Sequence, residues 1–144
     1  MIDVSGDYID IAEALLHNQI DISEDPICRA IINRSYYAVF NKIRKECEYL
    51  GINTEQYGGG SHINTINLFF DYLKKYPELK KCAQIATKDS ITLSKHRQNA
   101  DYHKNDKNLD FYVSKNNVII LVNLAKKVIG HIDFMINKLD STNT

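Results

Sequence analysis

The chain of 144 residues predicts an all-α fold: five helices in a mostly antiparallel bundle that forms one domain over residues 1–144. Apolar side chains recur every three or four positions over long stretches, which is the spacing of an amphipathic helix. No stretch alternates apolar and polar residues between turn signals, as a half-buried strand would. Two prolines and six glycines leave room for long helices without interruption.

The first two helices are expected over residues 7–17 and from Pro26 to Leu50. The first carries an apolar stripe, and a polar connector follows it. Pro26 falls in the first turn of the second helix, where its missing N–H is tolerated because that group would have no helical partner. Gly51 follows Leu50 directly, and glycine is common just past a helix end.

Three further helices are expected after a glycine-rich loop. Ser61 is a candidate cap for the third helix. Pro77 is expected to begin the fourth, which runs toward Tyr102, and Ser114 is a candidate cap for the fifth. Residues 140–144 are expected to form a frayed tail.

The composition is that of an ordinary globular domain, with 44% hydrophobic and 25% charged residues. No apolar run approaches the roughly 20 residues that a membrane helix needs, and the N-terminus lacks the basic start and apolar core of a signal peptide. The three cysteines are odd in number and widely spaced, which favours reduced thiols in the core over disulfides or a zinc site. We therefore expect a cytoplasmic protein with no membrane association.

The formal net charge is zero, with 18 basic and 18 acidic residues. Proteins that bind nucleic acid through phosphate contacts are usually basic, so a nucleic-acid role would depend on a local patch. Residues 95–107 carry more basic than acidic side chains, with two histidines beside them. This segment would suit either phosphate binding or an ordinary solvated helix end.

Arg97 and His103 lie six positions apart in that segment. An arginine can hold a phosphate through two parallel hydrogen bonds, and a histidine can transfer a proton near neutral pH. Together they could cleave a phosphodiester without a metal. On an unbroken helix their side chains would lie about 120° apart around the axis and would not converge. We therefore expect His103 at or just past a helix end near Tyr102, or a pair completed across a dimer.

The same segment allows other interpretations. Arg97 and Asp101 are four apart and could form an ordinary surface ion pair. His96 lies on the same face as His103, with Asn99 between them, and could be a second acid–base group. Metal binding by these two histidines is not expected, because two turns separate their backbones by about 10.5 Å along the axis. No metal and no cofactor is expected.

Residues outside this segment have two interpretations each. Tyr36 and Tyr37 point about 100° apart on a helix, so one is expected in the core and the other toward the fourth helix, with base stacking as the alternative. Arg34 could contact phosphate or extend from the bundle into solvent. Three histidines are isolated in the sequence and are expected to be structural or solvated: His17, His62 and His131.

Residues 34–41 read Arg-Ser-Tyr-Tyr-Ala-Val-Phe-Asn, and residues 97–103 read Arg-Gln-Asn-Ala-Asp-Tyr-His. A tyrosine pair followed by alanine and an aromatic residue, then an arginine before an Ala-Asp-Tyr ending, resembles the HEPN domain family (higher eukaryotes and prokaryotes nucleotide-binding). The similarity covers nearly the whole chain. It implies a small helical bundle that usually dimerises, and many members carry an R-x4-6-H motif that forms a metal-independent endoribonuclease site at the dimer interface.

By this resemblance, Arg97 and His103 match the catalytic motif. The neighbouring side chains are expected to support that site or to bind RNA: His96, Asn99, Asp101, Tyr102 and Lys104. The chain departs from the family's pattern directly after the arginine. Active members often have asparagine, aspartate or histidine there, and this chain has Gln98, with Asn99 one place later.

The expected function is that of a metal-independent endoribonuclease that acts as a toxin or phage-defence effector and leaves 2′,3′-cyclic phosphate and 5′-hydroxyl ends. Its expected partners are transfer or messenger RNA, a second copy of the chain, and a cognate antitoxin or nucleotidyltransferase. The alternative is a catalytically inactive HEPN module that binds a partner protein or a nucleotide. A paired nucleotidyltransferase could also modify a tyrosine such as Tyr102.

Overall fold

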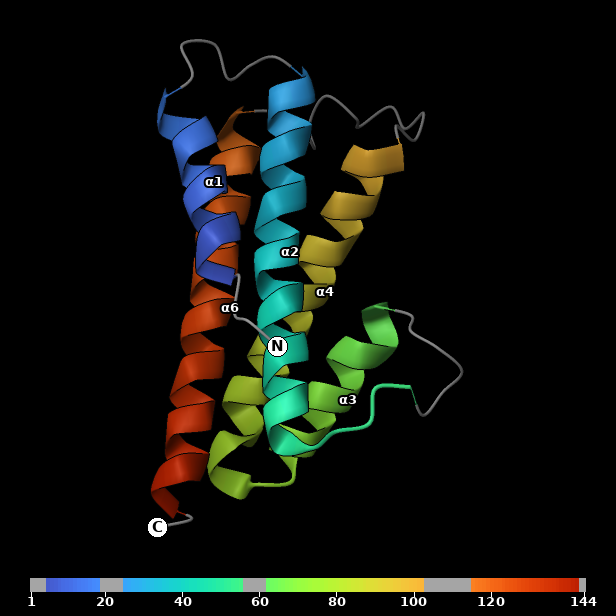
Figure 1. Ribbon diagram of the computed structural model, residues 1–144, viewed down its shortest axis with the longest axis vertical. Helices are drawn as coiled ribbons and strands as arrows, with labels where there is room; N and C mark the ends of the chain where they lie inside the picture. Colours follow the sequence, from blue (N-terminus) through green and yellow to red (C-terminus); the bar gives the residue numbers. More distant parts are fainter. Residues whose placement is uncertain (1–4, 19–24, 56–61, 103–114, 143–144) are drawn as a thin grey trace.

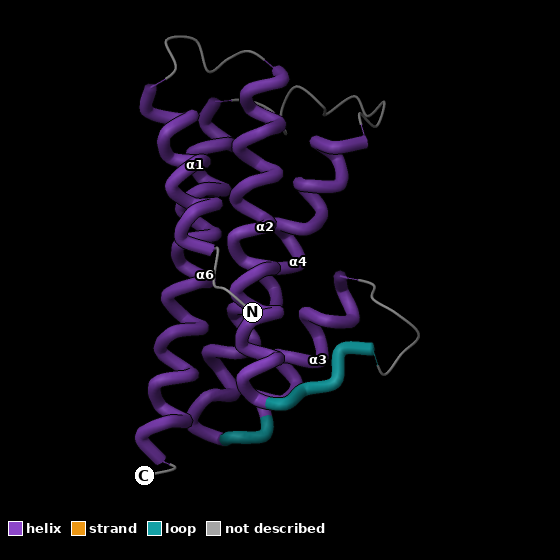
Figure 2. The backbone as a smooth tube through the Cα atoms, viewed as in Figure 1, coloured by secondary structure: helices purple, strands orange, loops and turns teal. Residues whose placement is uncertain are grey.

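The computed structural model describes residues 5–18, 25–55, 62–102 and 115–142, and within these ranges all the regular structure is helical (Figure 1). The expectation of an all-α helical bundle is confirmed. None of the described helices combines the length and the apolar character needed to cross a lipid bilayer. Figure 2 traces the path of the elements, which follow one another as α1 (Ser5–Asn18), α2 (Asp25–Leu50), α3 (His62–Lys74), the 3₁₀ turn η1 (Pro77–Leu79), α4 (Lys80–Tyr102) and α6 (Lys115–Thr142).

Pro77 begins a short 3₁₀ turn rather than the fourth α-helix itself. The Leu79 N–H donates to the Tyr76 carbonyl at 2.9 Å, and the α-helical bonding of α4 begins at Lys80. Proline suits the start of this turn because it has no N–H to pair and its backbone angle is preset. The expected start of the fourth helix was therefore one turn too early.

The C-terminal end of α6 also differs from the expectation. The helix continues through Thr142, so residues 140–142 are helical rather than frayed. Tyr49 of α2 donates its hydroxyl hydrogen to Asp140 Oδ1 at 2.8 Å, which links this last turn to a neighbouring helix. Polar composition alone does not reveal such a contact.

Helix α2 lies at the centre of the bundle. It packs against α1, α4 and α6, and its C-terminal half also meets α3 (Figure 1). Helix α3 in turn packs mainly on α4. Side chains of α2, α3 and α4 therefore meet in one region, which contains the candidate site.

The core is built from the inward faces of these helices. Burying a large apolar side chain contributes about 1.5–3 kcal/mol, so such residues fix how the helices pack. Fully buried large side chains come from four helices and include Tyr36, Phe69, Phe70, Leu93 and Ile132. All three cysteines are free thiols; Cys28 and Cys47 are buried in the core as expected, and Cys82 is partly buried.

Gly51 ends α2 with a positive φ of 71°. The Gly51 N–H donates to the Glu48 carbonyl at 3.2 Å, and the Ile52 N–H donates to the Cys47 carbonyl at 2.9 Å. These two bonds form the Schellman pattern, which satisfies carbonyls that have no partner within the helix. Glycine adopts the left-handed conformation that the pattern needs without steric cost.

Candidate functional site

Arg97 lies where α4 faces α2 and is almost fully buried, with 8% of its surface exposed. Its guanidinium carbon is 5.0 Å from the ring centre of Tyr36 and 5.7 Å from that of Tyr37. A planar, weakly hydrated guanidinium can stack on aromatic rings while it keeps its charge. The tyrosine pair of α2 therefore supports the arginine that the sequence singled out.

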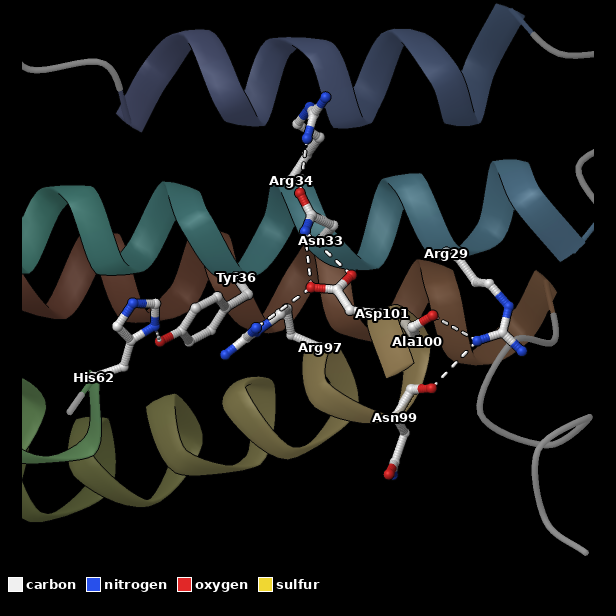
Figure 3. A network of polar contacts seen from close by, with 9 residues as sticks. All are labelled: Arg29, Asn33, Arg34, Tyr36, His62, Arg97, Asn99, Ala100 and Asp101. Carbon is white, nitrogen blue, oxygen red and sulfur yellow. Dashed lines mark hydrogen bonds and ion pairs between the residues drawn. The ribbon is translucent and has the colours of Figure 1, made fainter. Parts of the chain in front are cut away.

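Asp101 pairs with Arg97, and the pair is more buried than a surface ion pair. Arg97 Nη1 is 3.3 Å from Asp101 Oδ2, and the two side chains are 9% and 26% exposed. Asn33 of α2 donates from Nδ2 to both oxygens of Asp101 at 3.2 Å and accepts at Oδ1 from Arg34 Nη1 at 2.7 Å. Figure 3 shows these contacts running from Arg34 to Arg97. Side chains of two helices thus fix the carboxylate of Asp101.

Arg29 of α2 holds the end of α4. It is 7% exposed, and its Nη1 donates to the backbone carbonyls of Asn99, at 3.2 Å, and Ala100 (Figure 3). Carbonyls in the last turn of a helix have no N–H partner within it and form the negative end of its dipole, so a buried cation stabilises them. Arg29 was not predicted from the sequence, where its only signal is a basic residue inside an apolar stretch.

Tyr36 joins α2 to the beginning of α3. Its hydroxyl is 2.8 Å from His62 Nδ1, and its side chain is fully buried. Burial, opposed by the charge of Arg97, raises the pKa of Tyr36 to about 12. Tyr36 is therefore the core member of the tyrosine pair and stays neutral at physiological pH, while Tyr37 is half-buried beside it.

His62 is not isolated in the folded protein. Its ring stacks on Phe40 with ring centres 4.0 Å apart and planes 23° apart. Burial is the main reason that its pKa lies below the usual value, and the positive charges of Arg97 and Arg44 lower the pKa further. The structure therefore adds His62 to the residues around Arg97. Its position at the start of a helix after a glycine-rich loop was the only signal in the sequence.

His96 and Asn99 do not bring their side chains to Arg97. His96 Nδ1 is 3.5 Å from Asn117 Nδ2 of α6, and burial lowers the pKa of His96. Asn99 contributes its backbone carbonyl to the Arg29 contact, and its side chain points away from Arg29 in Figure 3. Among the predicted supporting residues, Asp101 forms an ion pair with Arg97.

The remaining predicted residues lie at or beyond the end of α4. His103 and Lys104 are outside the described residues, and so is the side chain of Tyr102, the last residue of that helix. The pairing of Arg97 with His103 therefore stays a prediction. Ser61 and the glycines before it also lie outside the described residues.

No metal site is evident in the ranges that the structure covers, since no three His, Cys, Asp or Glu side chains gather there. A cavity of about 480 Å³ opens between the end of α2 and α6, where Lys45, Tyr49 and Asp140 are among its lining residues. Arg97 and its partners do not line this cavity. The candidate site is instead the contact of α2 with α4, together with His62.

These features define a class of protein: an all-α bundle in which aromatic rings and a carboxylate hold a buried arginine near the end of a helix. Comparison of the chain with protein-family models, with curated proteins and with solved structures finds no match. The function is therefore inferred from the residues of the site and from the resemblance in the sequence.

Proposed function

We propose that this protein is a HEPN-type, metal-independent endoribonuclease that acts as a toxin or phage-defence effector. The position and contacts of Arg97 support this proposal best. Arg97 is stacked on two tyrosines and paired with Asp101. It lies within about two turns of the end of α4 and six positions before His103 in the chain. A guanidinium fixed in this way is suited to hold a phosphate.

In the proposed reaction, Arg97 donates hydrogen bonds to the non-bridging oxygens of the scissile phosphate as their negative charge grows. The 2′-hydroxyl of the RNA attacks phosphorus and the 5′-oxygen leaves, which gives 2′,3′-cyclic phosphate and 5′-hydroxyl ends. The 2′-hydroxyl loses a proton as it attacks, and the departing 5′-oxygen gains one, so the step is neutral in protons overall. His103 is the group proposed to transfer a proton between these oxygens, a role worth about 10²–10⁴-fold in rate. Because an arginine keeps its charge at physiological pH, a histidine sets the pH dependence of the rate.

Asp101 and Asn33 are positioning residues in this proposal. The Asp101 carboxylate is paired with Nη1 of Arg97. A phosphate therefore has to bind another N–H group of the guanidinium or displace the carboxylate. Asn33 holds both carboxylate oxygens and so limits how far Asp101 can rotate. The pair therefore sets the direction from which RNA meets the arginine.

The proposed assembly is a homodimer in which the second protomer completes the site, as the resemblance to the HEPN family implies. The proposed substrate is transfer or messenger RNA in the cytoplasm, and a cognate antitoxin or nucleotidyltransferase is the proposed regulator. Light scattering on the purified protein tests the assembly. A monomer at micromolar concentration would contradict the composite site.

The function is tested by cleavage of total and transfer RNA in the presence of EDTA. Wild type should produce cyclic-phosphate ends, and Arg97→Ala and His103→Ala should each lose at least about 10²-fold in rate. His17→Ala changes an exposed histidine of α1 and is the matched control, which should cleave like wild type. Because Arg97 is buried, circular dichroism has to show that its variant is folded. Cleavage that survives both substitutions would refute the assigned site.

The burial of Arg97 favours a second candidate function. Its surface is 8% exposed and Asp101 lies 3.3 Å from it, so much of its charge is already balanced within the protomer. The chain would then be a catalytically inactive module that binds a partner protein or a nucleotide, for example beside a nucleotidyltransferase. A folded wild type that cleaves no RNA would support this function. Mass spectrometry after coexpression with such an enzyme would detect modification of Tyr102.

A further inference from the structure

Three rings lie nearly parallel where α2 meets the start of α3. The His62 imidazole is 4.0 Å from the ring centre of Phe40 and 5.8 Å from that of Tyr36, with planes 23° and 17° apart. Tyr36 and Phe40 are 5.9 Å apart with planes at 13°. These rings and the Tyr36 hydroxyl at Nδ1 hold the imidazole in one orientation.

The second ring nitrogen of His62, Nε2, has no partner among the residues that the structure describes. In Figure 3 the nitrogen that does not meet Tyr36 points away from it. No residue in the described ranges forms a hydrogen bond with this Nε2, and His62 is only half-buried. An imidazole with one nitrogen fixed and the other open can bind a ligand in a defined direction.

The described charged groups that shift the pKa of His62 are positive. Arg97 of α4 and Arg44 of α2 lie 5.0 Å and 5.9 Å from the centres of the Tyr36 and Phe40 rings, which stack with the imidazole. Both arginines lower the pKa of His62, after the larger effect of burial. Two other titratable residues contact it: the Tyr36 hydroxyl is 2.8 Å from Nδ1, and the ring centre of Tyr37 is 5.9 Å from that of the imidazole. No carboxylate of the described residues is among the groups that shift its pKa.

Asp101 lies on the far side of Arg97 from His62 (Figure 3). It therefore balances Arg97 rather than a protonated imidazole, and the carboxylates near Arg44 are those of Glu48 and Glu55, which line a pocket with it. Tyr36 and Phe40 are buried, so these rings support the imidazole from within the core and leave the bases of an RNA to solvent. Cationic groups at a surface bind nucleic acid through its phosphates. We propose that His62 and Arg44 form a phosphate-binding subsite for single-stranded RNA beside Arg97. This subsite rests on the proposed function, since it binds a second phosphate of the same substrate.

The subsite binds phosphate best when His62 is protonated. Nδ1–H then donates to the Tyr36 oxygen, and Nε2–H donates to a phosphate oxygen. The bound negative charge stabilises the imidazolium and raises its pKa, so RNA affinity increases as the pH falls. A rise of about one pKa unit corresponds to about tenfold tighter binding to the protonated form.

The test measures binding apart from cleavage. The probe is a single-stranded uridine oligonucleotide with 2′-O-methyl groups, which has no 2′-hydroxyl to attack phosphorus. NMR of the imidazole should show the His62 pKa rising by about one unit when the probe binds. Fluorescence anisotropy of the full chain should show the Kd falling by up to about tenfold between about pH 7.5 and about pH 5.

Two variants and two controls locate the subsite. His62→Gln should flatten the pH dependence of the Kd, because His103 is then the remaining histidine proposed to act on the RNA. Arg44→Gln, at an exposed position, should weaken binding about 3–10-fold and lower the salt slope by about one. His17→Gln and Lys81→Gln change exposed residues of α1 and α4 and should bind like wild type. A His62→Gln protein whose Kd changes with pH as much as that of wild type would overturn the proposal, as would a probe that fails to shift the His62 pKa.

Inorganic phosphate is the second probe. If it shifts the His62 pKa as far as the oligonucleotide at equal concentration, the subsite takes free phosphate and the RNA assignment is wrong. Cleavage of unmodified RNA is scored separately. Wild type that binds RNA through His62 but cuts none overturns the ribonuclease function and supports the subsite. If wild type cleaves RNA but substitutions of His62 and Arg44 leave the Kd of the oligonucleotide unchanged, the subsite is refuted and the ribonuclease function is not.

Discussion

Replacing Arg29 with methionine removes the cation at the end of α4 and keeps a long apolar side chain in its place. Arg29 is 7% exposed, and its Nη1 binds the carbonyls of Asn99 and Ala100. A hydrogen bond to a charged group contributes about 1.5–3 kcal/mol, and a cation at a helix C-terminus adds about 0.3–1 kcal/mol. Both carbonyls accept from the same nitrogen, so together they contribute little more to the free energy of unfolding than one such bond. Arg29→Met should therefore lower the free energy of unfolding by about 2–3 kcal/mol.

Urea and thermal denaturation followed by circular dichroism measure this loss. In a chain of this length a loss of that size corresponds to a fall in Tm of about 6–9 °C. Arg44→Met removes an exposed arginine from the same helix and is the matched control, which should change the free energy of unfolding by no more than about 0.5 kcal/mol.

Hydrogen exchange places the effect in the structure. In Arg29→Met the amides of the last turns of α4 should exchange faster, because the end of that helix loses its contact with α2. If Arg29→Met and Arg44→Met were equally stable, the carbonyl contacts would contribute little, and the reasoning from burial and charge would be refuted.

Three further predictions concern single side chains. Tyr36→Phe removes the hydroxyl that meets His62 and should lower the free energy of unfolding in urea by about 1 kcal/mol; an unchanged value would mean that the bond contributes nothing in solution. Burial lowers the pKa of His96 in the folded protein, so the unfolded chain protonates this histidine more readily. The free energy of unfolding should therefore be independent of His96 above about pH 6.5 and decrease as the pH falls below that value. His62 acts in the same direction, and the stability–pH curve of His96→Gln should be flatter than that of wild type; an identical slope would contradict the shift at His96. Burial raises the pKa of Cys47 to about 12, so a thiol reagent near neutral pH should label it only as the protein unfolds, and immediate labelling would contradict its burial.

The helices were predictable because their signals are local. Apolar spacing marked each inward face, and Pro26 and Gly51 marked the two ends of α2 to within a residue. The candidate arginine was also visible, because its motif lies within a few turns of one helix. The spacing of Arg97 and Asp101 predicted their pairing as well, but it could not predict how deeply α2 buries them.

The rest of the site depends on contacts between segments that are distant in the sequence. Tyr36 links His62 to Arg97, and Arg29 binds carbonyls that lie about 70 positions away. No local pattern encodes which face of α2 meets the end of α4. His62 and Arg29 therefore have no distinguishing pattern in the sequence, and their contacts depend on how the helices pack.

Helix α2 supplies most of the groups around the candidate site from a single strip of its surface. Arg29, Asn33, Tyr36, Phe40 and Arg44 follow one another at steps of three or four residues. They fall within about 80° around the axis and extend about 22 Å along it, so one rigid rod sets the distances among them. One residue inserted between Asn33 and Tyr36 would turn half of the strip about 100° away from the other half. The length of this segment is thus constrained more strongly than most of its side chains, and α2 should accept substitutions more readily than insertions or deletions.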